Sequence, residues 1–313
     1  MKLVSFKVEK GNRVGIILGD KILDLISAGK TYQNEVGSDS NVSASNDMIQ
    51  FLNLGDEGIS AAKRITAFIR RKLLLREIST SQAVGLLYDI KNIKLNAPVA
   101  NPRKIVCLGL NYADHVKEAG KSQPREPILF SKPVTAIIGP EEPIVYPRIS
   151  KQVDYEVELA VVIGKKGKDV QVEDAYDHVA GYTVFNDVSA RDLQFHDGQW
   201  FRGKGFDTFA PMGPHLVLRE DISDPNNLRL RTKVNGQTRQ DGSTGSMIFK
   251  IPHLISFISQ VMTLEPGDII ATGTPAGVGI FAKPEPKLLK PGDVVEVWIK
   301  KIGTLRNPVV RYR

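Results

Sequence analysis

The segment V-D-Y-E-V-E-L-A-V-V-I-G, residues 153–164, restricts the possible folds of this chain more than any other stretch. Apolar residues alternate with Glu156 and Glu158 and then run without interruption to Ile163. A short apolar run that ends at a glycine is typical of a strand buried in a sheet. Because a strand sends residues i and i+2 to the same face, both carboxylates are expected on one face. The sequence therefore predicts a buried strand that begins with two neighbouring acids.

Two neighbouring carboxylates can be accommodated in two ways. In isolation, the short Glu-x-Glu motif favours an edge strand whose glutamates face water and pair with lysines. In a dry site, each ion would cost several kcal/mol in desolvation and the two would repel each other. A hard divalent cation such as Mg²⁺, Mn²⁺ or Ca²⁺ would resolve both problems, because these ions prefer oxygen ligands. A third acid favours the cation: Asp187 ends a second apolar strand, G-Y-T-V-F-N-D. Three carboxylates would meet if the two strands are neighbours, but the sequence does not give their register.

The remainder of the chain predicts a mostly β protein of the α+β class. A hairpin over residues 1–20 and a helix over Ala61–Glu77 form a small N-terminal domain, joined by a loop over Gly37–Asp47. The proline-containing segment Leu95–Arg103 is typical of a linker, so we expect domains at residues 1–100 and 101–313. Beyond the linker, strands are expected at residues 105–110, 136–138, 156–163, 180–186, 215–218, 228–234, 268–272 and 294–299. Helices are expected only at residues 112–119, 172–176 and 251–262.

Three further motifs carry side chains suited to chemistry. Lys204 lies between glycines and aromatic residues in W-F-R-G-K-G-F-D-T-F, a sequence that we expect not to be regular helix. It is either a cation for an anionic substrate or a solvated loop lysine. His115 and Glu118 lie three residues apart, which on a helix makes them an acid/base pair or a surface histidine with a stabilising neighbour. Thr274 stands in G-T-P-A-G-V-G, whose backbone N–H groups and hydroxyl could bind a carboxylate.

The composition excludes several classes of protein. The chain has 42 basic and 35 acidic residues and a net charge of +7, but its basic runs contain no interleaved aromatic residues to stack on bases. We therefore expect an anionic small substrate and no nucleic acid. No segment reaches the roughly 20 apolar residues of a membrane span, and no secretory signal is visible, so a cytoplasmic protein is expected. The single cysteine, Cys107, is flanked by apolar residues and is expected in the core.

In combination, these motifs resemble the fumarylacetoacetate hydrolase superfamily, in particular its acylpyruvase and 2-hydroxyhepta-2,4-diene-1,7-dioate isomerase-like branch. The resemblance covers residues 101–313 through N-Y-A-D-H-V-K-E, F-S-K-P, V-D-Y-E-V-E-L-A-V-V-I-G, G-Y-T-V-F-N-D-V-S-A-R-D-L-Q, K-G-F-D-T-F, G-T-P-A-G-V-G and I-G-T-L-R-N-P-V. The founding hydrolase has an additional aspartate ligand, whereas C-L-G-L-N-Y at the corresponding place contains no acid. This departure favours the three-carboxylate branch over fumarylacetoacetate as the substrate.

The resemblance implies curled, mixed β-sheets, a homodimer, and a Mg²⁺ or Mn²⁺ ion held by Glu156, Glu158 and Asp187. It also implies a substrate-binding Lys204 and a His/Glu pair at His115 and Glu118. The implied substrate contacts are completed by Gln194 and Thr274.

From this site we expect an enzyme, a metal-dependent hydrolase that cleaves a carbon–carbon bond in a 2,4-dioxo acid of the acylpyruvate type. In that reaction, His115 deprotonates a water and the pyruvate enolate leaves. The same enolate chemistry leaves alternatives open: isomerisation of 2-hydroxydienoic acids, decarboxylation of oxaloacetate, and hydrolysis or dehydration of 2-oxo-3-deoxy sugar acids. A non-enzymatic binding protein for anionic metabolites is the rival class.

Overall fold

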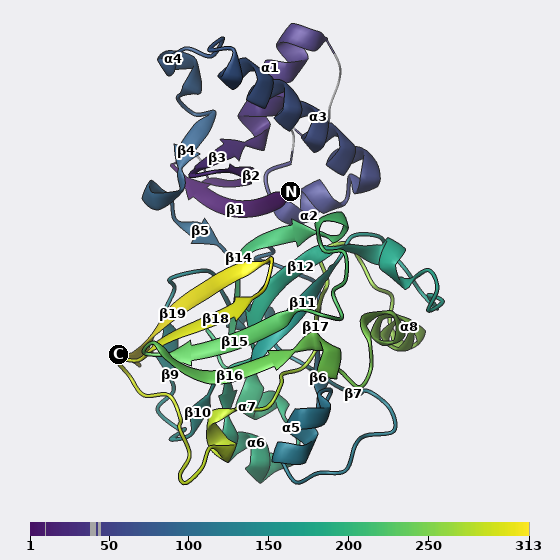
Figure 1. The fold of residues 1–313 in the computed structure, drawn as a ribbon, viewed down its shortest axis with the longest axis vertical. Helices are drawn as coiled ribbons and strands as arrows, with labels where there is room; N and C mark the ends of the chain where they lie inside the picture. Colours follow the sequence, from purple (N-terminus) through teal and green to yellow (C-terminus); the bar gives the residue numbers. More distant parts are fainter. Residues whose placement is uncertain (10, 38–41, 43–44, 313) are drawn as a thin grey trace.

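Strands from the first 100 residues and from residues 105–271 share one twelve-stranded sheet (Figure 1), in the order β4-β3-β2-β1-β14-β12-β11-β17-β6-β7 with β5 and β8 pairing at its side. The computed structural model describes residues 1–9, 11–37, 42 and 45–312. A five-stranded sheet, β16-β15-β18-β19-β9, and a two-stranded pair, β10-β13, complete the β structure of these residues. The fold is therefore α+β with mixed sheets, as the sequence predicted.

The N-terminal region contributes one end of the twelve-stranded sheet together with the helices that pack against it. Its elements are β1 (Lys2–Val8), β2 (Gly11–Leu18), β3 (Lys21–Asp24), α1 (Leu25–Val36), α2 (Met48–Leu52), α3 (Gly55–Leu74), α4 (Thr80–Ala83), β4 (Leu87–Asp89) and β5 (Leu95–Asn96). The predicted hairpin corresponds to β1 and β2, and α3 contains most of the predicted helix. Of the predicted loop over Gly37–Asp47, residues 38–41, 43 and 44 lie outside the described residues, and the Asp47 side chain caps α2.

The larger region contains the remaining elements. The first half holds β6 (Ile105–Gly109), α5 (Ala113–Glu118), β7 (Ile128–Ser131), β8 (Ile137–Ile138), β9 (Ile144–Tyr146), β10 (Val153–Asp154), β11 (Val157–Ile163), η4 (Ala175–His178), β12 (Val179–Asn186) and β13 (Ser189–Ala190). The second half holds α6 (Arg191–Asp197), α7 (Phe201–Lys204), β14 (Ala210–Leu218), β15 (Arg229–Val234), β16 (Gln237–Ser243), α8 (Ile251–Val261), β17 (Ile269–Ala271), η7 (Gly279–Phe281), β18 (Val294–Ile299) and β19 (Gly303–Arg311).

The segment 153–164 contains two strands, and the strand predicted at residues 156–163 corresponds to the second of them, β11. The first residues of the segment form β10, which pairs with β13, whereas β11 pairs with β12 on one side and β17 on the other. Tyr155 and Glu156 connect the two segments outside either strand. The chain therefore changes partner strand at Tyr155 and Glu156, just before Glu158.

The two faces of β11 enter different cores. Leu159, Val161 and Ile163 pack in the core between the two large sheets. Ala160 and Val162 pack in a second core that also contains Cys107 and the helices of the N-terminal region. Cys107 is buried, as predicted, and burial raises the pKa of its thiol. Because side chains alternate along a strand, Glu158 lies on the same face as Ala160 and Val162.

Three expectations about helices in the larger region were wrong. Where a helix was predicted at residues 172–176, residues 172–174 form a turn and Ala175–His178 form the 3-10 helix η4. The segment Phe201–Lys204 forms the single-turn helix α7, although its glycines had argued against helix. Gly203 is required by close packing, because a Cβ atom there would lie 2.6 Å from the backbone nitrogen of Gln194 on α6. Helix α6 had not been predicted at all. In Figure 1, α5, α6 and α7 lie together at the end of the molecule opposite the N-terminal region.

The proposed domain boundary near residue 100 falls between β5 and β6. Backbone pairing crosses it, since Lys2 and Leu3 of β1 lie opposite Val217 and Leu216 of β14. The division into two domains at residue 100 stays a proposal. The two regions share a sheet and a core.

Candidate active site

Three carboxylates meet at one end of β11 and β12. Val157 lies opposite Asn186 in the antiparallel register, so the residues just outside this pair, Glu156 and Asp187, come together. The Asp187 N–H donates to the Glu156 carbonyl at 2.9 Å. One carboxylate oxygen from each of Glu156, Glu158 and Asp187 lies within 4.8 Å of the others, and all three residues are buried. The structure therefore brings together the three acids that the sequence singled out.

Glu158 is the least compensated acid of the three. Its Oε2 accepts a hydrogen bond from the Gly273 N–H at 2.9 Å, and its Oε1 is buried without a hydrogen-bond partner among the described residues. Burial, followed by the negative charges of Asp187 and Glu156, raises the pKa of Glu158 well above its usual value. A buried carboxylate oxygen with no partner is costly unless a proton or a cation accompanies it.

Lys204 supplies positive charge to the other two acids. Its Nζ lies 2.9 Å from Glu156 Oε2 and 2.5 Å from Asp187 Oδ2, and 5.2 Å from the centre of the Phe130 ring. Burial alone would lower the pKa of this lysine, but Asp187 and Glu156 raise it. Lys204 is thus a buried ammonium rather than a solvated loop lysine. Helix α7 holds it there.

The pKa of Glu156 is shifted in the opposite direction to that of Glu158. Burial opposes the ionisation of Glu156, but Lys204 and Arg191 outweigh burial and lower its pKa to about 2. Arg191 Nη2 lies 2.6 Å from Glu156 Oε1. Two carboxylates two residues apart therefore have pKa shifts of opposite sign, which is a frequent property of sites that carry out proton transfer.

Lys132 is a buried cation that reasoning from the sequence did not single out. Its Nζ lies 2.6 Å from Asp187 Oδ1 and donates to the Val188 carbonyl at 3.0 Å. Burial outweighs the charge of Asp187 and lowers the pKa of this lysine. The only signal in the sequence was its place in F-S-K-P, one of the motifs of the resemblance.

The His115 and Glu118 side chains face each other on α5, as their spacing predicted. His115 Nδ1 lies 3.4 Å from Glu118 Oε2, and the imidazole is 6.1 Å from the Phe281 ring, measured between ring centres. Glu118 also accepts from the Gly277 N–H, at 2.9 Å to Oε1 and 3.1 Å to Oε2. A carboxylate held in this way can orient the imidazole for proton transfer.

The two expected substrate contacts, Gln194 and Thr274, are engaged within the protein. Gln194 is buried on α6, and its Oε1 accepts from Arg191 Nη1 at 3.0 Å. The Thr274 hydroxyl donates to the Val157 carbonyl at 2.9 Å and accepts from Gln240 Nε2 at 2.8 Å. Thr274 therefore fixes the loop after β17 against β11, and a role in substrate binding stays a prediction for both residues.

The donor set fits a hard divalent cation. It consists of three carboxylates on rigid backbone, one of them with a buried oxygen that has no partner, at separations suited to a single ion. The buried cations around the cluster already pair with some of its carboxylate oxygens. Fewer protein oxygens are then available to bind the ion, which would leave coordination positions for water or substrate. Glu156, Glu158 and Asp187 are the residues that would hold the ion.

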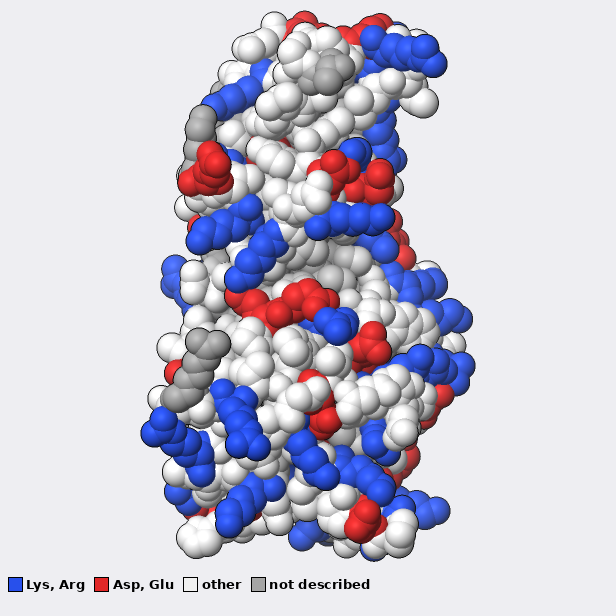
Figure 2. Space-filling view, turned by 90° about the vertical axis from the view of Figure 1, so that its left-hand side faces the viewer, with Lys and Arg blue, Asp and Glu red and all other residues white. Residues whose placement is uncertain are grey.

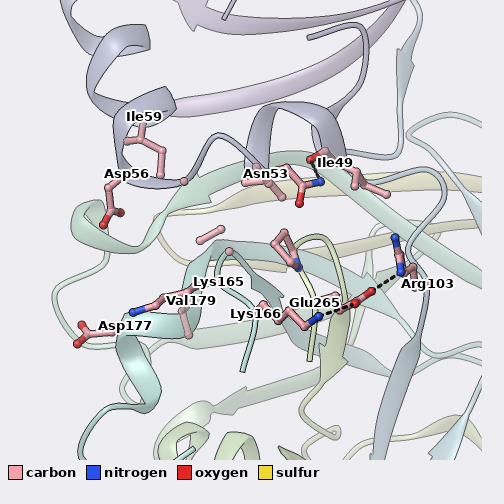
Figure 3. Close-up of a pocket in the computed structure, with 15 residues that line it drawn as sticks. Ile49, Asn53, Asp56, Ile59, Arg103, Lys165, Lys166, Asp177, Val179 and Glu265 are labelled. Carbon is pink, nitrogen blue, oxygen red and sulfur yellow. Dashed lines mark hydrogen bonds and ion pairs between the residues drawn. The ribbon is translucent and has the colours of Figure 1, made fainter. Parts of the chain in front are cut away.

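A cavity of about 500 Å³ lies elsewhere, between α2 and α3 on one side and residues 164–166 with Glu265 on the other. Figure 3 shows Asp56, Lys165 and Lys166 at its rim, and Arg103 and Lys166 paired with Glu265 at 2.6 and 3.8 Å. Its charged groups are exposed and partly paired with each other. We therefore assign the chemistry to the buried carboxylates and not to this cavity.

The surface does not form a continuous basic track on the face shown in Figure 2, where lysines and arginines are interrupted by acidic and uncharged side chains. Among the described residues, no helix is both long and apolar enough to cross a membrane.

Residues 104–310 match the sequence family described as "Fumarylacetoacetate (FAA) hydrolase C-terminal". The chain belongs to the fumarylacetoacetate hydrolase family. The matched segment contains all eight predicted site residues, which lie between His115 and Thr274. The family is one of enzymes that depend on divalent metals, in agreement with the buried carboxylates.

Relatives within this family carry different activities in their names. Over 265 residues, the chain is 48% identical to a mitochondrial oxaloacetate tautomerase of Xenopus laevis. This alignment covers 84% of this chain and 78% of the relative. It superposes on the crystal structure of a 2-hydroxyhepta-2,4-diene-1,7-dioate isomerase from Mycobacterium marinum with a TM-score of 0.72 and 35% identity, covering 99% and 98% of the two chains. The structure of a fumarylacetoacetate hydrolase from Exiguobacterium antarcticum gives a TM-score of 0.75 at 35% sequence identity, and the alignment covers 100% of each chain. Similarity to a tautomerase and an isomerase favours isomerisation, one of the alternatives drawn from the sequence, over the hydrolase first expected.

Proposed function

We propose that this protein is a divalent-metal-dependent tautomerase of a small 2-oxo dicarboxylic acid of the oxaloacetate type. The single observation that carries the choice of reaction is the 48% identity to an oxaloacetate tautomerase over 84% of the chain. The charges of the site suit such a substrate, because Lys204 and Arg191 place two buried cations beside the carboxylate cluster.

Keto–enol conversion transfers one proton from C3 of the 2-oxo acid and delivers one proton to the oxygen on C2, with no water consumed and no group released. When bound, a divalent cation would draw electron density from the 2-oxo group and so acidify C3. His115, oriented by Glu118, is the candidate base for the C3 proton. Lys204 stays protonated, since its pKa is raised, and would stabilise the charge that develops on the C2 oxygen.

A second candidate is the carbon–carbon hydrolase of a 2,4-dioxo acid, and the His115–Glu118 pair is the observation that favours it. An imidazole oriented by a carboxylate can take a proton from water as well as from carbon. The 35% identity to a fumarylacetoacetate hydrolase supports the same candidate. Decarboxylation of oxaloacetate and reactions of 2-oxo-3-deoxy sugar acids stay further alternatives, as does a binding protein without enzymatic activity.

The test follows the ultraviolet absorbance of enol-oxaloacetate as it converts to the keto form, with enzyme, after EDTA treatment, and after Mg²⁺ or Mn²⁺ is restored. We expect acceleration that EDTA abolishes and either metal restores. The His115→Asn variant should bind Mn²⁺ like the parent but lose about 10²- to 10⁴-fold in rate, the usual contribution of a general base. Hydrolysis of acetylpyruvate without acceleration of ketonisation would contradict the tautomerase and establish the hydrolase.

The remaining assignments are proposals of the same kind. We propose that the bound ion is Mg²⁺ or Mn²⁺ and that Ca²⁺ suits the site less well. We also propose that the protein is a homodimer in solution. A cytoplasmic location stays a prediction, and the relative from Xenopus laevis carries the word mitochondrial in its name. Elemental analysis of the purified protein and its mass in solution would test the metal and the dimer.

A further inference from the structure

Asp154 has no part in the proton transfers described above, yet it is among the most completely bonded carboxylates of the large region. Its side chain is fully buried. It accepts from the N–H groups of Tyr155 at 2.9 Å, Gly279 at 2.8 Å and Ile280 at 3.0 Å, and from Arg191 Nε at 2.9 Å. Four donors from three separate segments therefore converge on one carboxylate of β10.

The first link leads from Asp154 to the carboxylate cluster. Arg191 donates from Nε to Asp154 at 2.9 Å and from Nη1 to Gln194 at 3.0 Å, and its Nη2 forms an ion pair with Glu156 Oε1 at 2.6 Å outside hydrogen-bond geometry. The planar guanidinium cannot turn toward one partner without leaving another. Asp154 thus fixes the orientation in which Arg191 meets the proposed metal ligand Glu156.

The second link leads from Asp154 to the His115 helix. Gly279 and Ile280, which Asp154 holds, belong to the same short segment as Gly277 and Phe281. The Gly277 N–H binds Glu118, and the Phe281 ring packs near His115. The fit at Gly279 is tight, because a Cβ atom there would lie 2.5 Å from Asp154 Oδ1.

We propose that Asp154 is a positioning residue that couples the carboxylate cluster to the His115–Glu118 pair. The inference rests on the proposed function, since it assigns Asp154 to the alignment of that site. Both links start from the same carboxylate, so loss of its charge releases Arg191 and residues 277–281 together. A purely structural role predicts loss of stability alone, with metal affinity and the order of α5 unchanged in the folded protein.

Asp268 provides the matched control. It is also buried, and it accepts from the N–H groups of Glu265 at 2.7 Å and Lys104 at 3.2 Å and pairs with the Lys104 ammonium at 2.7 Å. It resembles Asp154 in burial and in its backbone donors but begins β17 at the end away from the carboxylates. Asp268→Asn therefore measures the effect of neutralising a buried, backbone-bonded aspartate as such.

The experiment compares Mn²⁺ affinity, by electron paramagnetic resonance of the free ion, and amide exchange of residues 113–120 in the parent, Asp154→Asn and Asp268→Asn. We expect Asp154→Asn to bind Mn²⁺ about 10- to 100-fold more weakly, the range for loss of a group that orients a ligand, and to exchange faster over residues 113–120. Asp268→Asn should match the parent in both. Folding of each variant is checked by circular dichroism.

Gly279→Ala serves as a second variant if Asp154→Asn does not fold. It keeps every charge, but its Cβ atom would lie 2.4 Å from the Lys287 carbonyl oxygen and 2.5 Å from Asp154 Oδ1. Residue 279 must therefore shift relative to both groups, and faster exchange of residues 113–120 is expected. The role of Asp154 would be overturned if a folded Asp154→Asn variant has the Mn²⁺ affinity and the amide exchange of the parent. Where Gly279→Ala replaces that variant, the same result in Gly279→Ala would overturn it. Effects of Asp268→Asn as large as those of Asp154→Asn would also overturn the role of Asp154. Failure of the parent to bind Mn²⁺ would instead overturn the metal site of the proposed function.

Discussion

Surface ion pairs of the N-terminal region and the buried ion pairs at the end of β11 use charge in opposite ways. Lys63 pairs with Glu220 of the larger region while the two side chains are 44% and 49% exposed, and Lys21 pairs with Asp89 at 40% and 47% exposure. At the end of β11, the Lys204 and Asp187 side chains that pair are 3% and 0% exposed. Exposed pairs contribute little to stability, whereas buried charges are retained at a cost that stability alone does not explain. The contrast supports the proposal that the functional site lies at the end of β11.

The largest expected effect comes from removing Glu158, which forms no ion pair with any of the described residues. Glu158→Gln should lower Mn²⁺ affinity by at least about 100-fold, since changes to orienting groups around a metal site already cost about 10- to 100-fold. Its free energy of unfolding, measured in urea with EDTA present, should equal or exceed that of the parent, because the substitution removes repulsion with Asp187 and Glu156. A clear loss of stability together with normal Mn²⁺ binding would contradict the contrast drawn above.

Removing the cation should have the reverse consequence for stability. Lys204→Met leaves Glu156 and Asp187 buried beside less positive charge, and truncating one partner of a buried pair typically costs about 3–5 kcal/mol. Urea unfolding of the variant in EDTA measures this loss. Combining Lys204→Met with Glu158→Gln should recover part of it, and a double variant less stable than either single one would exclude mutual compensation of these charges.

A buried histidine at the junction of the two regions predicts a pH dependence. Burial, followed by the charge of Lys2 and the N-terminal ammonium, lowers the pKa of His215 to about 4. The unfolded chain then binds a proton more readily than the folded one, so stability is complete above about pH 6.5 and falls as the pH decreases toward 4. The shift corresponds to roughly 3 kcal/mol. His215→Gln should remove this part of the pH dependence of urea unfolding, and an unchanged profile would exclude His215 as its source.

The smallest effect is expected for the surface pair. Lys63→Ala should change the free energy of unfolding by less than about 1 kcal/mol and leave catalysis unaltered, because Lys63 and Glu220 are both solvated in the folded state. The measurement at low and at high salt should differ little between parent and variant. A change as large as that of Lys204→Met would remove the distinction between the two regions.

The sequence predicted the acids of the site better than their counter-charges. Glu156 and Glu158 interrupt an apolar strand, and Asp187 ends another, so their positions conflict with burial and attract attention. Lys132 breaks no periodic pattern, and only the folded chain brings it to Asp187 across 55 residues. Local patterns therefore reveal misplaced charges, whereas the partners of those charges depend on tertiary structure.

The fold was predictable where patterning is regular and was missed where packing decides. Buried strands such as β11 and β12 follow from their apolar runs. The division of residues 153–163 between β10 and β11 does not, because it depends on β13 as a separate partner. The helix α7 was missed because glycine was interpreted as a helix breaker, whereas Gly203 is needed for contact with α6.

The core shared by the two regions has a consequence for protein engineering. Phe185, Met212 and Leu216 of the large sheet are buried in the same cluster as side chains from α1, α2 and α3. A fragment limited to residues 104–310 would keep every proposed catalytic side chain but would expose this apolar face to water. Large exposed apolar patches promote aggregation, so solubility rather than missing chemistry would limit such a fragment, and a useful minimal enzyme would need that face redesigned with polar residues.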